Sequence, residues 1–245
     1  MTDDARAARV VLEALLETDA PALRAELPPG FADAAEAYAR LLLEANARLN
    51  LTRVVEPDAV ARLHLLDAVA ALPLLPGSTE RALDIGSGGG VPGIVLAIAR
   101  PEVRWTLVDS VRKKADTLRS FVAALGLDNV EVLGERAEML GRGPSRASFD
   151  VVTARACAAL PVLAEYALPL LRVGGTLISW KGPISAEELT AGATASAILG
   201  GGAPEERPTG IPALGDHRFV LIDKLRPTDP RWPRRPGEPA RRPIG

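Results

Sequence analysis

The chain has 245 residues, of which 47% are hydrophobic, and its 29 Lys and Arg nearly balance its 31 Asp and Glu. This length and apolar content suffice for one α/β domain with an appended segment, and the net charge of −2 restricts any nucleic-acid site to a local patch. A single cysteine, Cys157, excludes an intrachain disulfide and argues against a Cys-based metal site. The start "MTDDARAARV" lacks the apolar segment of a signal peptide, and no uncharged apolar run approaches membrane-spanning length. We therefore expect a cytoplasmic protein with neither a membrane nor a metal partner.

Residues 1–78 are predicted to form a helical N-terminal extension. The segments "ARAARVVLEALLE" and "ADAAEAYARLLLEANARLN" repeat apolar residues at three- and four-residue spacing, and "LPPG" separates them. A third helix is expected to start after Pro57 and to carry "DAVARLHLLDAVAAL".

Residues 79–225 are predicted to form an α/β domain with a doubly wound, mostly parallel sheet and helices on both faces. Short apolar runs predict strands around 81–85, 104–109, 130–133, 149–154 and 175–180. Helical patterns fall around 92–100, 111–126, 159–171 and 184–198. This alternation is typical of parallel strands joined by right-handed crossovers. The run "HRFVLIDKL" suits a final strand, whose direction the sequence alone does not define.

The stretch "LDIGSGGGVPGIVLAIAR" (83–100) predicts a strand, a glycine-rich turn and a helix that bring the backbone close to a ligand. Its glycines match two patterns. Gly88, Gly90 and Gly93 match the G-x-G-x-x-G of dinucleotide sites. Asp84, Gly86, Gly88 and Gly90 match the D-x-G-x-G-x-G of S-adenosylmethionine sites.

Three features favour S-adenosylmethionine over a dinucleotide. Asp84 supplies the acid that the methyltransferase pattern requires, and "LLRVGGTLISW" resembles the fifth-strand segment of class I methyltransferases. Pro92 removes one N–H from a helix start that a pyrophosphate would use, whereas S-adenosylmethionine has no phosphate. Asp109, followed by Ser110, ends the next strand and would accept ribose hydroxyls from either ligand.

The segment after the fourth strand, "FDVVTARACAAL", lacks the (N/D)-P-P-(Y/F) pattern of exocyclic-amine methylation. Cys157 has neither a preceding proline nor a second cysteine, so we interpret it as a small buried hydrophobic residue rather than as the nucleophile of a C5-pyrimidine enzyme. Guanine N7 carries a free lone pair and needs no general base, so catalysis there reduces to positioning. The sequence permits this acceptor without requiring it.

Polar residues near the predicted site could do the positioning. Arg155 and Lys181 follow the fourth and fifth strands, at the edge where open α/β sheets bind ligands. Asn46 and Asn50 would share one helical face if the helix persists, and His64 and Asp67 lie three apart. The alternative is an ordinary capping asparagine and a hydrogen-bonded core histidine, and spacing alone favours that alternative.

The last 20 residues, 226–245, form a basic, proline-rich C-terminal arm. Six arginines outnumber Asp229 and Glu238, and six prolines oppose a helix or a central strand. A disordered tail and an extended arm laid on phosphate both fit this composition.

Several segments together resemble one family, the 16S ribosomal RNA guanine-N7 methyltransferases, once called glucose-inhibited division protein B. The matching segments occur in the expected order and run from about residue 31 to the C-terminus: "NARLNLTRV", "RLHLLDAV", "ALDIGSGGGVPGIVLAI", "TLVDSVRKKADTLRSFVAALGLDNVEV", "RAEML", "FDVVTARACAAL", "GGTLISWKG" and "RWPRRPGEPARRP". Residues 1–30 carry no such signal.

The resemblance implies a class I, Rossmann-like methyltransferase with a helical N-terminal extension that methylates N7 of one guanine in 16S ribosomal RNA. S-adenosyl-L-methionine is the implied cofactor, and naked RNA or the small ribosomal subunit the implied partner of a monomer. Ala137 and Glu138 would lie in a loop after the third strand, beside the adenine, and Val91 departs from the larger residue common at its position.

The site residues expected from pattern and resemblance fall into three groups. Asp84, Gly86, Gly88, Gly90, Val91, Asp109, Ser110, Ala137, Glu138 and Arg155 are expected to bind the cofactor. Arg155, Asn50 and Lys181 are expected to position the reacting groups. Arg53, His64, Arg231, Arg234 and Arg235 are expected to bind RNA.

Two other functions stay open at this stage. An NAD-dependent oxidoreductase would use the same glycine loop, although no acid/base pair for hydride transfer stands out. A non-catalytic ribosome-assembly factor could use the same fold, although the donor positions are intact.

Overall fold

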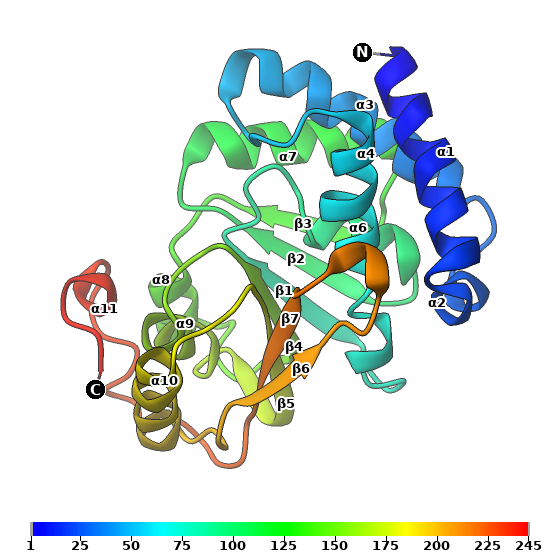
Figure 1. The fold of residues 1–245 in the computed structure, drawn as a ribbon. Coiled ribbons are helices and arrows are strands. Elements are labelled where there is room, and N and C mark those ends of the chain that lie inside the picture. Colours follow the sequence, from blue (N-terminus) through cyan, green and yellow to red (C-terminus); the bar gives the residue numbers. More distant parts are fainter. Residues whose placement is uncertain (1, 245) are drawn as a thin grey trace.

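Seven strands form one sheet in the computed structural model, which describes residues 2–244 (Figure 1). The strand order is β3-β2-β1-β4-β5-β7-β6. The strands are β1 (Arg81–Ile85), β2 (Arg104–Val108), β3 (Val130–Leu133), β4 (Phe149–Arg155), β5 (Leu171–Lys181), β6 (Glu205–Pro208) and β7 (Arg218–Asp223). β1 to β5 are parallel, whereas β7 runs antiparallel to both of its neighbours. The mostly parallel sheet is therefore confirmed, and the direction of the final strand is now defined.

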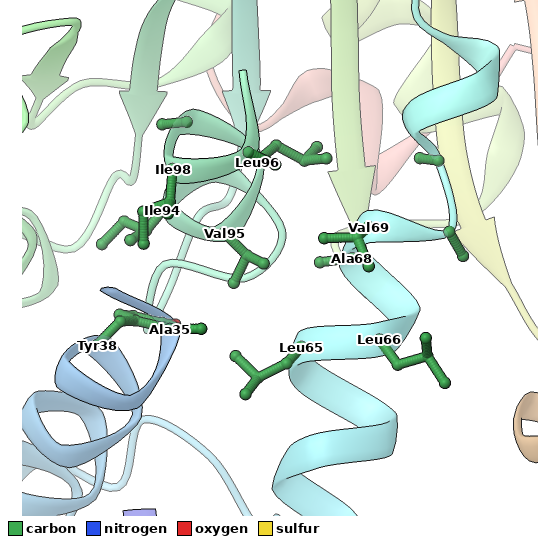
Figure 2. Packing of buried hydrophobic residues seen from close by; sticks show 14 of the residues in the cluster. Ala35, Tyr38, Leu65, Leu66, Ala68, Val69, Ile94, Val95, Leu96 and Ile98 are labelled. Atoms are coloured by element: carbon green, nitrogen blue, oxygen red, sulfur yellow. The ribbon is translucent and has the colours of Figure 1, made fainter. Parts of the chain in front are cut away.

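One face of the sheet carries the N-terminal helices together with two crossover helices. They are α1 (Thr2–Thr18), α2 (Pro21–Glu26), α3 (Phe31–Leu49), α4 (Pro57–Val60), the π-helical turn η1 (Ala61–Leu66), α5 (Asp67–Val69), the 3-10 turn η2 (Leu72–Leu74), α6 (Gly93–Ala99) and α7 (Arg112–Leu125). Figure 2 shows how Tyr38 of α3, Leu65 of η1 and Ile94 of α6 approach one another in this layer. The N-terminal helices thus share a hydrophobic core with the sheet.

The opposite face carries α8 (Ala137–Arg142), α9 (Leu160–Ala167) and α10 (Ala186–Leu199). The 3-10 turn η3 (Pro212–Leu214) precedes β7, and α11 (Glu238–Arg241) ends the chain on the same side as α8 to α10 (Figure 1). Strand residues alternate between the two layers because successive side chains point to opposite faces. In β7, Phe219 and Leu221 join one core cluster, and Val220 and Ile222 join the other.

Most predicted elements lie within a few residues of their observed bounds, and the differences have local causes. The helix expected over 159–171 ends at Ala167, because Pro169 has no N–H to continue the helical hydrogen bonds. β5 then begins at Leu171, ahead of the predicted 175. α2, β6, α8 and α11 were not predicted, since each has only four to six residues and too little periodicity to detect.

Candidate donor and acceptor site

The glycine loop folds back over the end of β2. Gly86 has φ +70°, a conformation that side chains rarely adopt, and a Cβ there would lie 3.0 Å from Sγ of Cys157. The N–H groups of Gly86 and Ser87 both donate to the carbonyl of Val108, at 2.8 and 3.0 Å. The loop therefore forms the floor of a site at the carboxyl ends of β1, β2 and β4.

Asp109 holds the loop from the end of β2. Its Oδ2 accepts the N–H of Gly88 at 3.0 Å, and its Oδ1 accepts the N–H of Val111 at 2.8 Å. Each carboxylate oxygen keeps a further lone pair, so the two backbone contacts orient Asp109 without exhausting its capacity to accept hydroxyl groups.

A cavity of about 280 Å³ opens beside Asp109. Five of the expected cofactor-binding residues line it: Gly86, Asp109, Ser110, Ala137 and Glu138. Ala137 and Glu138 open the short helix α8 rather than lying in a loop, which corrects the sequence-based expectation. We call this space the donor cavity. A larger cavity of about 580 Å³ lies at the opposite edge, by the amino ends of β2 and β3.

The other expected cofactor-binding residues support the loop instead of lining the donor cavity. Gly90 donates its N–H to Ser87, and a Cβ on Gly90 would lie 2.6 Å from Ile94. Val91 packs against the core of the N-terminal layer. Arg155 lines a neighbouring cavity. Direct contact of Gly90, Val91 and Arg155 with a cofactor stays a prediction.

Asp84 is fully buried beneath the loop. Thr153 on the adjacent strand donates its hydroxyl to Oδ1 at 2.8 Å, and Oδ2 has no hydrogen-bond partner within residues 2–244. Burial raises the pKa of this carboxyl to about 6, although the Thr153 hydrogen bond opposes the shift. Asp84 is therefore a buried support of the loop, and direct contact with a cofactor stays a prediction.

A second cavity, of about 440 Å³, adjoins the donor cavity, and Ala156 lines both. Its walls are Val54, Leu63, His64, Asp67, Arg155, Ala156, Trp180, Lys181, Gly182 and His217. Ala156 has φ +51°, an uncommon conformation for a residue with a Cβ. This turn follows Arg155, which lines the second cavity, and precedes Cys157, which lines the donor cavity. We call the second space the acceptor cavity.

Arg155 is held by three hydrogen bonds in the wall of the acceptor cavity. Nη1 donates to the carbonyl of Leu63 and, at 3.2 Å, to Oδ2 of Asp67. Nη2 lies 3.1 Å from Nδ1 of His64. A guanidinium has five N–H groups, so two remain for a ligand. These hydrogen bonds fix the planar guanidinium of Arg155 in one orientation.

His64 fits the core histidine of the alternative interpretation, and its contact with RNA stays a prediction. It is buried, and its Nε2 lies 2.8 Å from the hydroxyl of Thr52. Burial, together with the charge of Arg155, lowers the pKa of His64 to about 4, so the ring is neutral near pH 7. Nδ1 of His64 lies 3.1 Å both from the carbonyl of Leu63 and from Nη2 of Arg155, so protein groups contact both ring nitrogens.

Asn50 ends α3 in a left-handed conformation, with φ +47°, so the helix does not persist and Asn46 and Asn50 share no helical face. Asn46 instead accepts the N–H of Thr52 at 2.8 Å. Asn50 caps the helix through its backbone, as the alternative interpretation proposed, and its role in positioning a substrate stays a prediction. Exposed Arg53 follows Thr52 directly.

Lys181 ends the fifth strand of the sheet and Cys157 follows the fourth, and the structure places Lys181 as expected but not Cys157. Lys181 lines the acceptor cavity, where its Nζ contacts Glu188 at 2.8 Å and the carbonyl of Ala158 at 3.1 Å. Cys157 is exposed, so the prediction of a buried hydrophobic residue is wrong. Enclosure of its sulfur against Gly86, reinforced by the charge of Asp84, raises the pKa of the thiol to about 11.

The C-terminal arm is ordered and docked on α8 and α9. Glu165, which is fully buried, accepts the backbone N–H of Arg234 at 2.8 Å and forms an ion pair with its guanidinium. Gly237 donates its N–H to Glu138 of the donor cavity at 2.8 Å. Arg231 and Arg235 are exposed. Arg234 thus holds the arm in place, and its contact with RNA phosphate stays a prediction.

The amino-acid sequence of this chain matches a known family. A family model described as rRNA small subunit methyltransferase G matches residues 32–205. The protein of that name from Deinococcus radiodurans is 46% identical over 216 residues, covering 85% of each chain. Its namesake from Moorella thermoacetica is 42% identical over 214 residues, covering 85% of this chain and 88% of that protein. This chain belongs to the rRNA small subunit methyltransferase G family.

Solved structures of lower similarity share the fold of this family member. The O-methyltransferase TomG from Streptomyces achromogenes, solved in complex with SAM, is 18% identical with a TM-score of 0.53, covering 77% of this chain and 90% of that chain. The mitomycin 7-O-methyltransferase MmcR is 17% identical with a TM-score of 0.53, covering 75% and 60%. The class I methyltransferase fold is confirmed.

Sequence reasoning missed several residues of the two cavities in this family member. Tyr166 and Lys114 line the donor cavity, and Trp180 and His217 line the acceptor cavity. His217 precedes β7, so it reaches the carboxyl edge of the sheet only because β7 is antiparallel. The residues of 2–244 contain no group of three or more His, Cys, Asp or Glu that could hold a metal ion. Over the same range, every helix is too short or too polar to cross a membrane.

Proposed function

We propose that this chain transfers a methyl group from S-adenosylmethionine to N7 of a specific guanine in the 16S RNA of the small ribosomal subunit. One observation carries the proposal: the donor and acceptor cavities meet at Ala156, beside the fixed guanidinium of Arg155. Two adjoining cavities let a donor and an acceptor approach in line, and family membership identifies the acceptor as ribosomal RNA.

The residues of the donor cavity fit S-adenosylmethionine. Asp109 presents two oriented carboxylate oxygens for ribose hydroxyls, and Ile85, Val108 and Ala137 supply an apolar wall for a purine. Pro92, at the start of α6, offers no N–H to a phosphate. When bound, this cofactor supplies a sulfonium methyl group that a lone pair can attack.

The residues of the acceptor cavity fit an acceptor that loses no proton. His64 is neutral and protein groups contact both of its ring nitrogens, so it is not poised as a general base. The thiol of Cys157 is protonated near neutral pH, which argues against a cysteine nucleophile. Arg155 keeps two N–H groups for the donor carboxylate or for guanine O6. Guanine N7 needs only this positioning.

The proposal extends to the remaining sequence-based expectations. Arg53, Arg231 and Arg235 are exposed and are the arginines that we assign to RNA phosphate. A monomer acting in the cytoplasm, on naked RNA or on the assembled subunit, fits this reaction. The two alternatives, an NAD-dependent oxidoreductase and a non-catalytic assembly factor, receive no support from the family match or the fold.

The direct test of the acceptor is to map N7-methylguanine in ribosomal RNA from cells with and without the gene. We expect one modified guanine to disappear from the small-subunit RNA and to return when purified protein and S-adenosylmethionine are added. An unchanged modification map would refute the proposed function.

The donor site is tested by Asp109→Ala. Loss of charge-assisted hydrogen bonds to both ribose hydroxyls should weaken donor binding by about 1.5–3 kcal/mol, measured by calorimetry. Asp116→Ala, which changes an exposed residue of α7, is the control and should bind the donor normally. Unchanged affinity in Asp109→Ala would remove Asp109 from the ribose site.

A further inference from the structure

His217 lies at the mouth of the acceptor cavity. Its Nδ1 is 2.9 Å from Oδ1 of Asp67, whose other oxygen accepts from Arg155. Its Nε2 has no hydrogen bond within the described residues 2–244. Asp67 is buried, whereas the His217 side chain is 38% exposed and that of Arg155 is 21% exposed. The ring of His217 is thus anchored from below and open to a ligand at Nε2.

The charges around His217 favour its protonated form. The hydrogen bond to Asp67 raises the pKa of His217 above its usual value, although desolvation and the charge of Arg155 oppose the shift. The other charged or titratable groups of the cavity are Lys181, which pairs with Glu188, and neutral His64. Asp67 balances one of its two cationic partners, so protonated His217 leaves this cluster with a net positive charge.

We propose that His217 binds the phosphate of the target guanine nucleotide at the rim of the acceptor cavity. This inference rests on the proposed function. Val54, Leu63 and Trp180 provide an apolar interior for the base, and His217 is the more exposed of the cations that Asp67 holds. A base seated in the interior leaves its phosphate at the mouth of the cavity.

The chemistry of the reaction also assigns this cation to the phosphate rather than to the base. Guanine N7 must keep its lone pair free and acquires positive charge as the methyl group arrives. A cation hydrogen-bonded at N7 would occupy this lone pair, whereas a cation at the phosphate strengthens binding without acting on N7. A contact made equally in ground and transition states affects binding and not turnover.

The test uses unmethylated small ribosomal subunits, purified from cells that lack the gene, as the binding partner. At pH 6.5 we expect His217→Gln to weaken subunit binding roughly three- to tenfold and to reduce the slope of log affinity against log salt by about one, the effect of one lost phosphate contact. At pH 9, where less of wild-type His217 is protonated, the difference between the two proteins should be smaller. His217→Arg should bind tightly at both pH values, and turnover at saturating subunits should be the same in all three.

Arg218→Gln is the matched control, because it removes one positive charge at the next residue, which pairs with Glu206 on β6. It should keep the pH dependence of the wild type. Wild-type affinity and salt slope in His217→Gln at pH 6.5 would overturn the proposal. If the wild-type protein transfers no methyl group to subunits at any pH, the proposed function fails instead.

A second measurement does not depend on activity. The chain contains two histidines, so ring signals in nuclear magnetic resonance are readily assigned. Guanosine 5′-monophosphate should shift the His217 signals below its pKa, and guanosine without phosphate should leave them unchanged. Equal shifts from both compounds would place the contact on the base and overturn the proposal.

Discussion

Arg155 depends on its planar guanidinium, because its three hydrogen bonds reach Leu63, Asp67 and His64 in different directions. A lysine ammonium is a point charge on a flexible stem and does not reproduce this fork. A lysine at this position would lose these hydrogen bonds and would no longer be held facing a ligand.

We therefore expect Arg155→Lys to fold normally and to lose at least tenfold in kcat/KM for methyl transfer, about 1.4 kcal/mol of transition-state stabilisation. Arg119→Lys, on the exposed side of α7, should keep full activity. Calorimetry then separates two roles: weakened donor affinity indicates contact with the donor carboxylate, and unchanged affinity with lower turnover indicates contact with the acceptor. A fully active Arg155→Lys enzyme would show that Arg155 is an ordinary surface charge.

Burial of the Asp84 carboxyl costs stability at neutral pH. Its pKa of about 6 lies above the unfolded value, so the folded protein holds this proton more tightly than the unfolded chain does. The free energy of unfolding therefore receives a contribution from Asp84 at low pH that is lost as pH rises through about 6.

Asp84→Asn removes this pH dependence. Measured without donor, the variant should unfold at a higher temperature than the wild type at pH 8, by up to about 3 kcal/mol in free energy of unfolding, and the gain should vanish by pH 4. Asp116→Asn, at an exposed position, should show no such difference. An advantage of equal size at both pH values would indicate a cause other than ionisation.

Among the structural elements, the C-terminal arm contains one arginine that is paired within the protein and others that are exposed. Two arginines outside the arm also hold it in place. Arg146 donates to carbonyls of the arm at Thr228, Asp229 and Trp232, and Arg142 donates to that of Pro233. Arg234 neutralises buried Glu165, whereas Arg231 and Arg235 stay exposed. Docking of the arm and recognition of RNA are thus assigned to different side chains.

We expect variants of the paired arginine to lose stability and variants of the exposed arginines to lose RNA binding. Arg234→Ala leaves the buried carboxylate of Glu165 without its partner and should destabilise the fold by about 3–5 kcal/mol in urea unfolding. The double variant Arg231→Ser and Arg235→Ser should keep its stability, weaken RNA binding and reduce the salt slope by up to about two. An unchanged salt slope in the double variant would remove the arm from the RNA interface.

In the whole molecule, the N-terminal helices and the sheet share one hydrophobic core. Ala8 and Leu12 of α1 are fully buried in the same cluster as Ile94 of α6 and Trp105 of β2. Figure 2 shows α3, η1 and α6 meeting in this layer. A substitution that destabilises α1 should therefore also lower the stability of the sheet.

Leu12→Ala should lower the free energy of unfolding by about 2–5 kcal/mol, since it leaves a cavity in this core. Val10→Ala, on the exposed face of α1, should change it little. Tryptophan fluorescence is the readout, because Trp105 and Trp180 lie in the sheet. If α1 unfolds in a separate transition without a change in tryptophan fluorescence, α1 and the sheet do not unfold together.

The sequence by itself determined the α/β fold, the glycine loop and the class of donor. These depend on local patterns: apolar periodicity, a strand that ends in Asp84 and glycines, and Asp109 at the end of the next strand. Parallel strands end at the same edge of the sheet, so residues at these ends lie close together. Arg155 and Lys181 line one cavity for this reason.

Only the tertiary structure decided which side chains are already bonded to one another and which remain free for a ligand. His64 contacts Thr52, 12 residues away in the chain, and Arg234 pairs with Glu165, 69 residues away. His217 reaches the acceptor cavity because β7 reverses direction, which local periodicity does not encode. Hydrogen bonds and ion pairs between remote residues depend on three-dimensional distance, and spacing along the chain carries no information about it.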